Sequence, residues 1–131
     1  MKLRVLVVDD TSLFRRVIAD ALALLPDVEV VGTAPNGKIA LERAATLLPD
    51  LMTLDIEMPE MDGVDAVAAG SYLYPSVKYV MLTIFDDEEK IFKAIKAGAF
   101  GYLLKDESAE NIAEVLIQMY ETGLGPISPG I

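Results

Sequence analysis

Short, continuous apolar runs alternate five times along the chain with longer segments of helical periodicity. The apolar runs do not alternate with polar residues, which indicates strands that are buried on both faces of a sheet. Regular strand–helix alternation predicts an α/β fold with a parallel sheet and right-handed crossovers. The expected strands are residues 3–8, 28–33, 51–54, 77–83 and 100–104. The expected helices lie at about 12–25, 37–48, 64–73, 86–97 and 108–122.

The ends of several helices carry recognisable signals. Thr11 or Asp10 is expected to cap the first helix, whose apolar stripe runs from Phe14 to Leu25. Gly98 is well placed to end the fourth helix. The 131 residues suggest one domain, over residues 1–122. Gly or Pro occupies five of the nine positions 123–131, which predicts a linker or frayed tail.

Composition excludes several kinds of function. The chain has no Cys and no His, which excludes Ser–His and Cys nucleophile systems, zinc sites built on these residues, and disulfides. Its net charge of −10 argues against nucleic-acid binding by this chain alone. No apolar run is long enough for a membrane span, and the N-terminus lacks a signal-peptide pattern. We therefore expect a cytoplasmic location and no membrane contact.

Charged and hydroxyl side chains follow four of the predicted strands. The first strand ends in Asp9 and Asp10, the third is followed by Asp55, the fourth ends in Thr83, and Lys105 follows the fifth. In an open parallel sheet, ligands bind beyond the carboxyl ends of the strands. Three carboxylates gathered there repel one another, and Mg²⁺ together with the lysine would balance their charge.

This set of residues suggests phosphoryl chemistry. An Asp carboxylate is a known phosphoryl nucleophile, so an aspartyl phosphate is expected on Asp55, followed by slow hydrolysis. Lys105 and Thr83 would contact the phosphoryl oxygens. Taken singly, each residue has an ordinary explanation as a turn, cap or surface residue. Their conjunction at four strand ends is what favours a site.

Four motifs resemble those of a known family. Residues 5–10 (VLVVDD), 54–63 (LDIEMPEMDG), 81–83 (MLT) and 101–105 (GYLLK) are similar, in order and spacing, to the receiver domain of two-component response regulators. The resemblance covers residues 2 to about 122. It implies a CheY-like, three-layer flavodoxin-like (βα)5 fold, with a doubly wound five-stranded parallel sheet in the order 2-1-3-4-5.

The resemblance also implies roles for individual residues. Phosphotransfer would come from a sensor histidine kinase or a phosphotransfer protein, and the chain would be a phosphorylated switch that slowly dephosphorylates itself, not a turnover enzyme. The implied roles are Asp55 as phosphoacceptor, Asp9, Asp10, Asp55 and the backbone carbonyl of Glu57 as Mg²⁺ ligands, Thr83 and Lys105 as phosphoryl contacts, and Thr83 with Tyr102 as the switch pair. Tyr102 would turn inward on phosphorylation, and the surface of the fourth helix, fifth strand and fifth helix would then change partners. Simple packing at a strand edge is the alternative for Tyr102.

Three positions depart from the family pattern or modify it. Asp106 follows Lys105, where many members have a proline after a cis peptide, so the isomer of this bond is open. Ile84 stands where many relatives have a small residue, and its bulk would hinder the attacking water. The side chain of Glu57 is close enough in sequence to Asp55 to touch the metal or a water.

The output is the least determined property. Residues 9–16 and 30–37 are similar to receivers of chemotaxis methylesterase regulators. Residues 82–90, 97–106 and 123–129 are more like receivers of NarL/LuxR-type transcription factors. We therefore expect a receiver from a longer transcription regulator that controls an output domain or partner protein. A stand-alone or chemotaxis-type receiver is the alternative.

Other interpretations stay open at this point. Leu13, Ile117 and Tyr120 lie off the core stripes, which suggests either edge-of-core packing or a patch for a homodimer. An aspartate-nucleophile phosphatase would use the same residues, with Glu57 as general acid. A nucleotide-binding domain would need a Gly-rich loop after the first strand, and the chain has Asp9-Asp10 there. A receiver that binds partners without phosphorylation is disfavoured by the complete acidic set.

Overall fold

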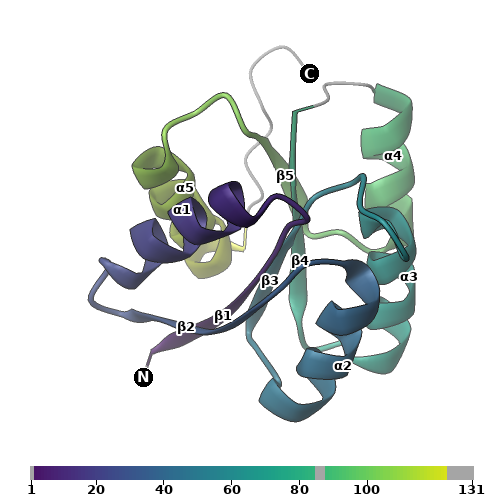
Figure 1. Ribbon diagram of the computed structural model, residues 1–131, viewed down its shortest axis with the longest axis horizontal. Helices are drawn as coiled ribbons and strands as arrows, with labels where there is room; N and C mark the ends of the chain where they lie inside the picture. The colour runs from purple at the N-terminus through teal and green to yellow at the C-terminus, as the bar shows by residue number, and fades with distance from the viewer. Residues whose placement is uncertain (1, 85–87, 124–131) are drawn as a thin grey trace.

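The computed structural model describes residues 2–84 and 88–123 and has three layers. Five parallel strands form one sheet in the order β2-β1-β3-β4-β5. Helices α1 and α5 cover one face, and α2, α3 and α4 cover the other (Figure 1). The predicted fold class and strand order are confirmed. The elements are β1 (Leu3–Val8), α1 (Ser12–Ala23), β2 (Val28–Ala34), α2 (Gly37–Leu47), β3 (Leu51–Leu54), α3 (Gly63–Leu73), β4 (Lys78–Thr83), α4 (Glu88–Ala97), β5 (Gly101–Leu104) and α5 (Ala109–Thr122).

Both faces of the sheet are buried, as the continuous apolar runs predicted. Along β1, Val5 and Val7 pack into the core beneath α1 and α5. Leu6 and Val8 pack into the second core, beneath α2, α3 and α4. Successive side chains of a strand point to opposite faces, so a strand between two helical layers is apolar over most of its length.

The ends of α1 differ from the prediction. The helix ends at Ala23, before Leu25, although Leu25 still packs against the core. The Leu25 N–H donates to the carbonyl of Leu22, a tighter turn that closes the helix ahead of Pro26. Thr11 occupies the cap position, but its side chain makes no cap hydrogen bond. The periodicity located the buried stripe correctly and could not locate the last helical residue.

Other helix ends agree with the sequence signals. Ser108, the expected first residue of the fifth helix, lies one position before α5 and caps it by accepting a hydrogen bond from the Asn111 N–H. Gly98 follows α4 with φ of 121°, a conformation that other residues rarely adopt, as its predicted role as a stop requires. Asp86, the expected first residue of the fourth helix, and the expected tail beyond Gly123 lie outside the described residues.

The strand order creates the crevice that the site needs. β1 has β2 on one side and β3 on the other, and α1 and α2 leave β1 and β2 toward opposite faces of the sheet (Figure 1). This switch in winding direction opens a space at the carboxyl ends of β1 and β3. Every peptide bond among the described residues is trans, so the Lys105–Asp106 bond is trans. Within residues 2–84 and 88–123, no helix has both the length and the apolar content to cross a membrane.

Gly63 closes the loop that follows β3. Its N–H donates to the carbonyl of Ile56 at 2.7 Å. A Cβ atom at this position would lie 2.1 Å from the backbone oxygen of Asp55 and 2.6 Å from the Met81 side chain. The absence of a side chain therefore lets the first turn of α3 approach the backbone that carries Asp55.

We predict that Gly63→Ala lowers the free energy of unfolding by about 1–3 kcal/mol, because the added methyl group meets fixed backbone. Tyr72→Ala on the exposed face of the same helix is the control, with an expected change within about 0.5 kcal/mol. Urea unfolding of both variants measures the difference. Equal losses in the two variants would contradict the steric argument.

Candidate functional site

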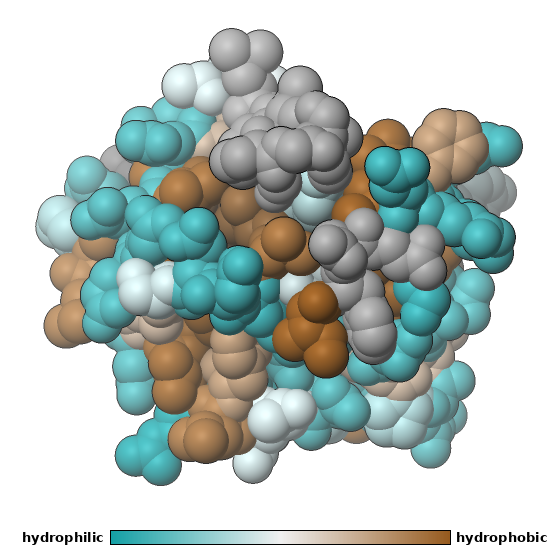
Figure 2. Space-filling model, turned by 90° about the horizontal axis from the view of Figure 1, so that it is seen from above, coloured by the Kyte–Doolittle hydropathy of each residue, from teal (hydrophilic) through white to brown (hydrophobic). Residues whose placement is uncertain are grey.

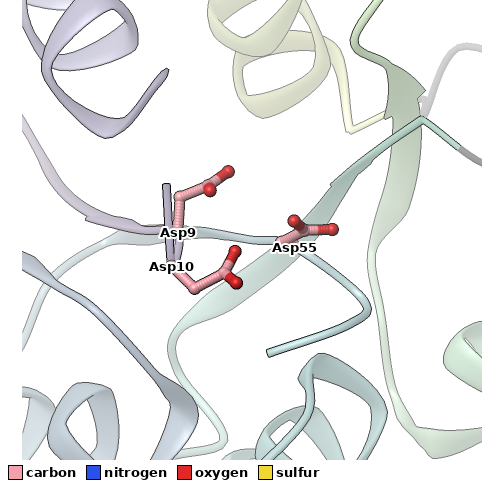
Figure 3. Close-up of side chains that lie close together, drawn as sticks. All are labelled: Asp9, Asp10 and Asp55. Carbon is pink, nitrogen blue, oxygen red and sulfur yellow. The ribbon is translucent and has the colours of Figure 1, made fainter. Parts of the chain in front are cut away.

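Three aspartates meet at the carboxyl ends of two neighbouring strands. Asp9 and Asp10 directly follow β1, and Asp55 directly follows β3. One carboxylate oxygen from each lies within 4.8 Å of the others, and the side chains of Asp9 and Asp10 extend toward the side of Asp55 (Figure 3). Asp9 and Asp55 are buried, whereas Asp10 is exposed. The structure therefore brings together the acidic residues that the sequence singled out.

Lys105, the first residue after β5, also reaches this cluster. Its ammonium nitrogen donates to Oδ2 of Asp9 at 2.7 Å and to Oδ2 of Asp55 at 3.0 Å. Its side chain is only 10% exposed, so both ion pairs are largely shielded from water. Its backbone N–H donates to the carbonyl of Thr83 at 2.9 Å, which fixes the start of the β5–α5 loop against the end of β4.

Burial and charge act in opposite directions on the two central groups. Burial raises the pKa of Asp55 above its ordinary value, and the Asp9 charge adds to this, while Lys105 partly offsets it. Burial alone would lower the pKa of Lys105, but its hydrogen bonds to Asp9 and Asp55 outweigh burial and raise it. The lysine is therefore firmly protonated, and Asp55 holds its negative charge at a free-energy cost.

The first turn of α1 and the residue before it contact Asp9 and Lys105. The Thr11 N–H donates to Oδ1 of Asp9 at 2.8 Å, so this carboxylate fixes the residue that precedes α1. The Arg15 guanidinium donates to the carbonyl of Asp9 at 2.6 Å. The ring of Phe14 lies 4.2 Å from the ammonium nitrogen of Lys105. Sequence reasoning placed Phe14 in the core stripe and missed its contact with Lys105, because helical periodicity does not show what lies beside a helix.

The two predicted switch residues lie on adjacent strands. Thr83 is the last residue of β4 and is completely buried. Tyr102 lies in β5, and its ring is already packed in the core on the side of α2, α3 and α4. Within the described part of the chain, the buried Tyr102 hydroxyl has no hydrogen-bond partner. Such a group is unfavourable in a packed core and needs a physical reason.

Glu57 lies in the loop after β3, two residues beyond Asp55. Its side chain forms an ion pair with Lys90 of α4. This contact joins the loop that carries Asp55 to α4, the helix that connects β4 to β5. The sequence predicted Glu57 as a neighbour of the metal. It gave no signal for the ion pair with Lys90, which lies 33 residues away in the chain. The predicted role of the Glu57 backbone carbonyl as a metal ligand stays a prediction.

The donor set suits a hard divalent cation. Carboxylate oxygens are the ligands that Mg²⁺ prefers, and one or two such groups normally leave it several waters or a phosphate to bind. Asp10 is exposed to solvent, whereas Asp9 is buried and hydrogen-bonded to the Thr11 N–H and to Lys105. The cluster therefore combines a fixed carboxylate with one that solvent can reach. Asp9, Asp10 and Asp55 therefore fit the cation that the sequence suggested.

The surface around the site is mixed in polarity. Figure 2 looks onto the end of the molecule where the strands finish, and apolar side chains there lie directly beside polar ones. Ile84, which is 72% exposed, lines a cavity of about 290 Å³ together with Leu104, Lys105 and Asp106. The residue that was expected to hinder water thus stands beside the lysine of the site.

The expected apolar patch is only partly present. Leu13 is 70% exposed on α1. Ile117 and Tyr120 are half-buried on α5, and Ile117 packs against the core. Edge-of-core packing is therefore confirmed for Ile117, and a homodimer stays a prediction.

We predict that Asp55→Asn unfolds at a higher temperature than the parent at pH 7 without divalent cations, because the buried charge is removed. The folded-state pKa of Asp55 lies above the unfolded value, so ionisation favours the unfolded chain. The advantage of Asn is thus absent below pH 3.8 and develops as the pH rises through the folded-state pKa. Thermal unfolding between pH 3 and pH 8 in a chelating buffer measures it.

The control is Glu114→Gln, which removes one exposed negative charge from α5. It accounts for the general effect of reducing the net charge of −10. An Asp55→Asn variant that gained no more than Glu114→Gln would contradict the assigned cost of burial.

Comparison with known proteins gives concordant matches. Transcriptional regulatory protein LnrK of Bacillus subtilis is 38% identical over 122 residues, which cover 93% of this chain and 56% of that protein. A protein-glutamate methylesterase/protein-glutamine glutaminase of Nocardioides sp. is 40% identical over 121 residues, covering 91% of this chain and 33% of that protein. The chain therefore spans about half or less of the length of these relatives.

Solved structures agree with the sequence matches. The signal receiver domain of NarL from Mycobacterium tuberculosis superposes with a TM-score of 0.87 at 36% identity, covering 92% of this chain and 97% of that domain. Residues 5–117 match the family described as the response regulator receiver domain. With the acidic cluster, the lysine and the strand order all in place, the chain belongs to the response regulator receiver domain family.

Proposed function

We propose that this receiver domain accepts a phosphoryl group on Asp55, in a Mg²⁺-dependent reaction, from a sensor histidine kinase or a phosphotransfer protein. One observation carries the proposal: the Asp55 carboxylate is buried next to Asp9 and Asp10 and is held by the Lys105 ammonium group. This arrangement supplies a nucleophile, ligands for a cation and a fixed positive charge in one pocket.

The transfer itself is a displacement at phosphorus. A carboxylate oxygen of Asp55 forms a bond to phosphorus, while the bond from phosphorus to the donor atom breaks and leaves its electron pair on the donor. Asp9, Asp10, Asp55 and the carbonyl of Glu57 would hold Mg²⁺, which supplies charge neutralisation for the incoming phosphoryl oxygens. Lys105 and Thr83 contact the transferred group. Later attack of water on phosphorus releases inorganic phosphate and regenerates the Asp55 carboxylate.

Phosphorylation then changes the surface formed by α4, β5 and α5. The Lys105 backbone N–H is hydrogen-bonded to Thr83 at the end of β4, and Glu57 is paired with Lys90 of α4. A change of charge at Asp55 therefore acts on the positions of both β4 and α4. Thr83 and Tyr102 are the switch pair in this proposal. The orphaned Tyr102 hydroxyl supports an alternative position for this side chain in the other state.

The output we propose is transcription. Supporting this are the LnrK match and the structural likeness to the NarL receiver, together with the residues 82–90 and 97–106. The methylesterase match at 40% identity favours a chemotaxis-type output as the second candidate. We propose that residues 1–122 are the receiver and that 123–131 lead into the remainder of the regulator. The domain by itself is a switch, and its location is proposed to be cytoplasmic.

We predict that the parent gains one phosphoryl group in intact mass on incubation with acetyl phosphate and Mg²⁺. Asp55→Asn is expected to gain none, because an amide is not a phosphoryl nucleophile. Amide hydrogen exchange should then change on α4 and β5 of the parent alone.

The controls separate the parts of this proposal. Asp10→Asn leaves the nucleophile in place, so slower phosphorylation at low Mg²⁺ that recovers at high Mg²⁺ would identify a metal ligand. Phosphorylation of Asp55→Asn to the same extent as the parent would exclude Asp55 as the acceptor. Rapid turnover of a phosphate monoester by the parent would favour the phosphatase alternative.

We predict that Ile84→Ala shortens the lifetime of the phosphorylated parent several-fold, because a bulky side chain beside Lys105 hinders the attacking water. Loss of the phosphoryl group is followed by intact mass after the donor is removed. Leu24→Ala, at an exposed position near the end of α1, is the control and should leave the lifetime unchanged. A parent half-life of only seconds, or equal lifetimes in parent and Ile84→Ala, would contradict the hypothesis.

A further inference from the structure

We propose that Phe14 is a positioning residue that holds the Lys105 ammonium group in the site through a cation–π contact. The proposal rests on the phosphotransfer function proposed above and adds a residue to it. Phe14 touches none of the reacting atoms and acts only through Lys105.

The contact has the geometry of a cation–π interaction. The ammonium nitrogen of Lys105 lies 4.2 Å from the centre of the Phe14 ring, within the range of about 6 Å over which such contacts are favourable. The lysine side chain is 10% exposed, and the ring is half-buried. Because water is largely excluded from this contact, the attraction is stronger than at an exposed surface.

The ring differs in kind from the other partners of Lys105. Within the part of the chain that the structure describes, the ammonium group contacts the Asp9 carboxylate, the Asp55 carboxylate and the Phe14 ring. Both carboxylates belong to the proposed metal and phosphoryl site, so their oxygens acquire other partners during the reaction. The Phe14 ring is a ligand of neither the metal ion nor the phosphoryl group. Its attraction for the ammonium group is therefore unaffected when the carboxylates exchange partners.

The ring is itself held in place from two sides. Phe14 lies in the first turn of α1 and packs against the core beneath α1 and α5. The next residue, Arg15, donates to the Asp9 carbonyl and so fixes this turn to the end of β1. A lysine side chain has four flexible carbon–carbon bonds and loses much freedom when its charge is localised. A fixed ring at its tip reduces the positions that the ammonium can occupy.

The same chain offers a matched control. Phe100 lies 4.9 Å from the ammonium nitrogen of Lys78, which is the first residue of β4. This second pair is at the opposite end of the sheet from Asp55. It therefore reports on the general effect of altering a phenylalanine that contacts a lysine, without touching the site.

The test replaces Phe14 by phenylalanine analogues carrying increasing numbers of fluorine atoms, and separately by Leu. Fluorination largely keeps the shape of the ring and progressively weakens the negative electrostatic potential of its face. We expect the rate of phosphorylation by acetyl phosphate at saturating Mg²⁺ to fall stepwise along the series, by about two- to thirty-fold in total. The Mg²⁺ concentration for half-maximal rate should change much less, and the same series at Phe100 should leave both quantities unchanged.

A spectroscopic measurement follows the contact independently of the reaction. In protein labelled with ¹³C-lysine, the Hε resonance of Lys105 should be displaced upfield by the Phe14 ring. The displacement is expected to disappear in Phe14→Leu and to persist in the fluorinated variants whose rings remain folded in place. The resonance is assigned by its loss in Lys105→Arg.

The outcomes distinguish this inference from the proposed function. A parent that gains no phosphoryl group overturns both. If the parent is phosphorylated and Phe14→Leu is slow, but the fluorinated series is flat, the ring serves packing alone and the inference is wrong. An unshifted Lys105 resonance in the parent also overturns it, with the function of Asp55 untouched.

Discussion

The two ion pairs of Lys105 are the interaction on which the geometry of the site depends. They join residues that follow β1, β3 and β5, and the lysine reaches past the end of β4, to which its backbone is hydrogen-bonded. Four strand ends are thereby fixed relative to one another. The order β2-β1-β3-β4-β5 allows this, because it makes the strands that precede the two buried aspartates neighbours.

The site is electrostatically unbalanced without a further positive charge. One lysine faces three carboxylates, and burial raises the pKa of Asp55. A cation or a chemical change at Asp55 therefore alters the forces on every group around it. The contacts that lead away from the site, between Lys105 and Thr83 and between Glu57 and Lys90, reach the strand and the helix on the side where the output surface is proposed. The charge at Asp55 and the position of α4 are in this way physically connected.

The sequence was most informative where a residue's own chemistry decides the structure. The nearly continuous apolar runs of the strands indicated a sheet covered on both faces, and Gly98 marked the end of α4. The side chains after the strands identified Asp9, Asp10, Asp55 and Lys105, because parallel strands bring their carboxyl ends to one edge. The prediction was wrong at the end of α1, and Thr11 lies at the predicted cap position without making a side-chain cap hydrogen bond, since helix ends depend on hydrogen bonds to neighbouring segments.

What the sequence alone determined is therefore the fold class, the edge of the sheet that carries the chemistry, and the residue types gathered there. The tertiary structure decided which of these groups are buried, which pair with one another, and which residues of other elements support them. Phe14 beside Lys105, Arg15 on the Asp9 carbonyl and Lys90 on Glu57 are contacts of this kind. Periodicity fixes the face of a helix that is buried, but only the packing of that helix against its neighbours fixes which side chain meets which charge.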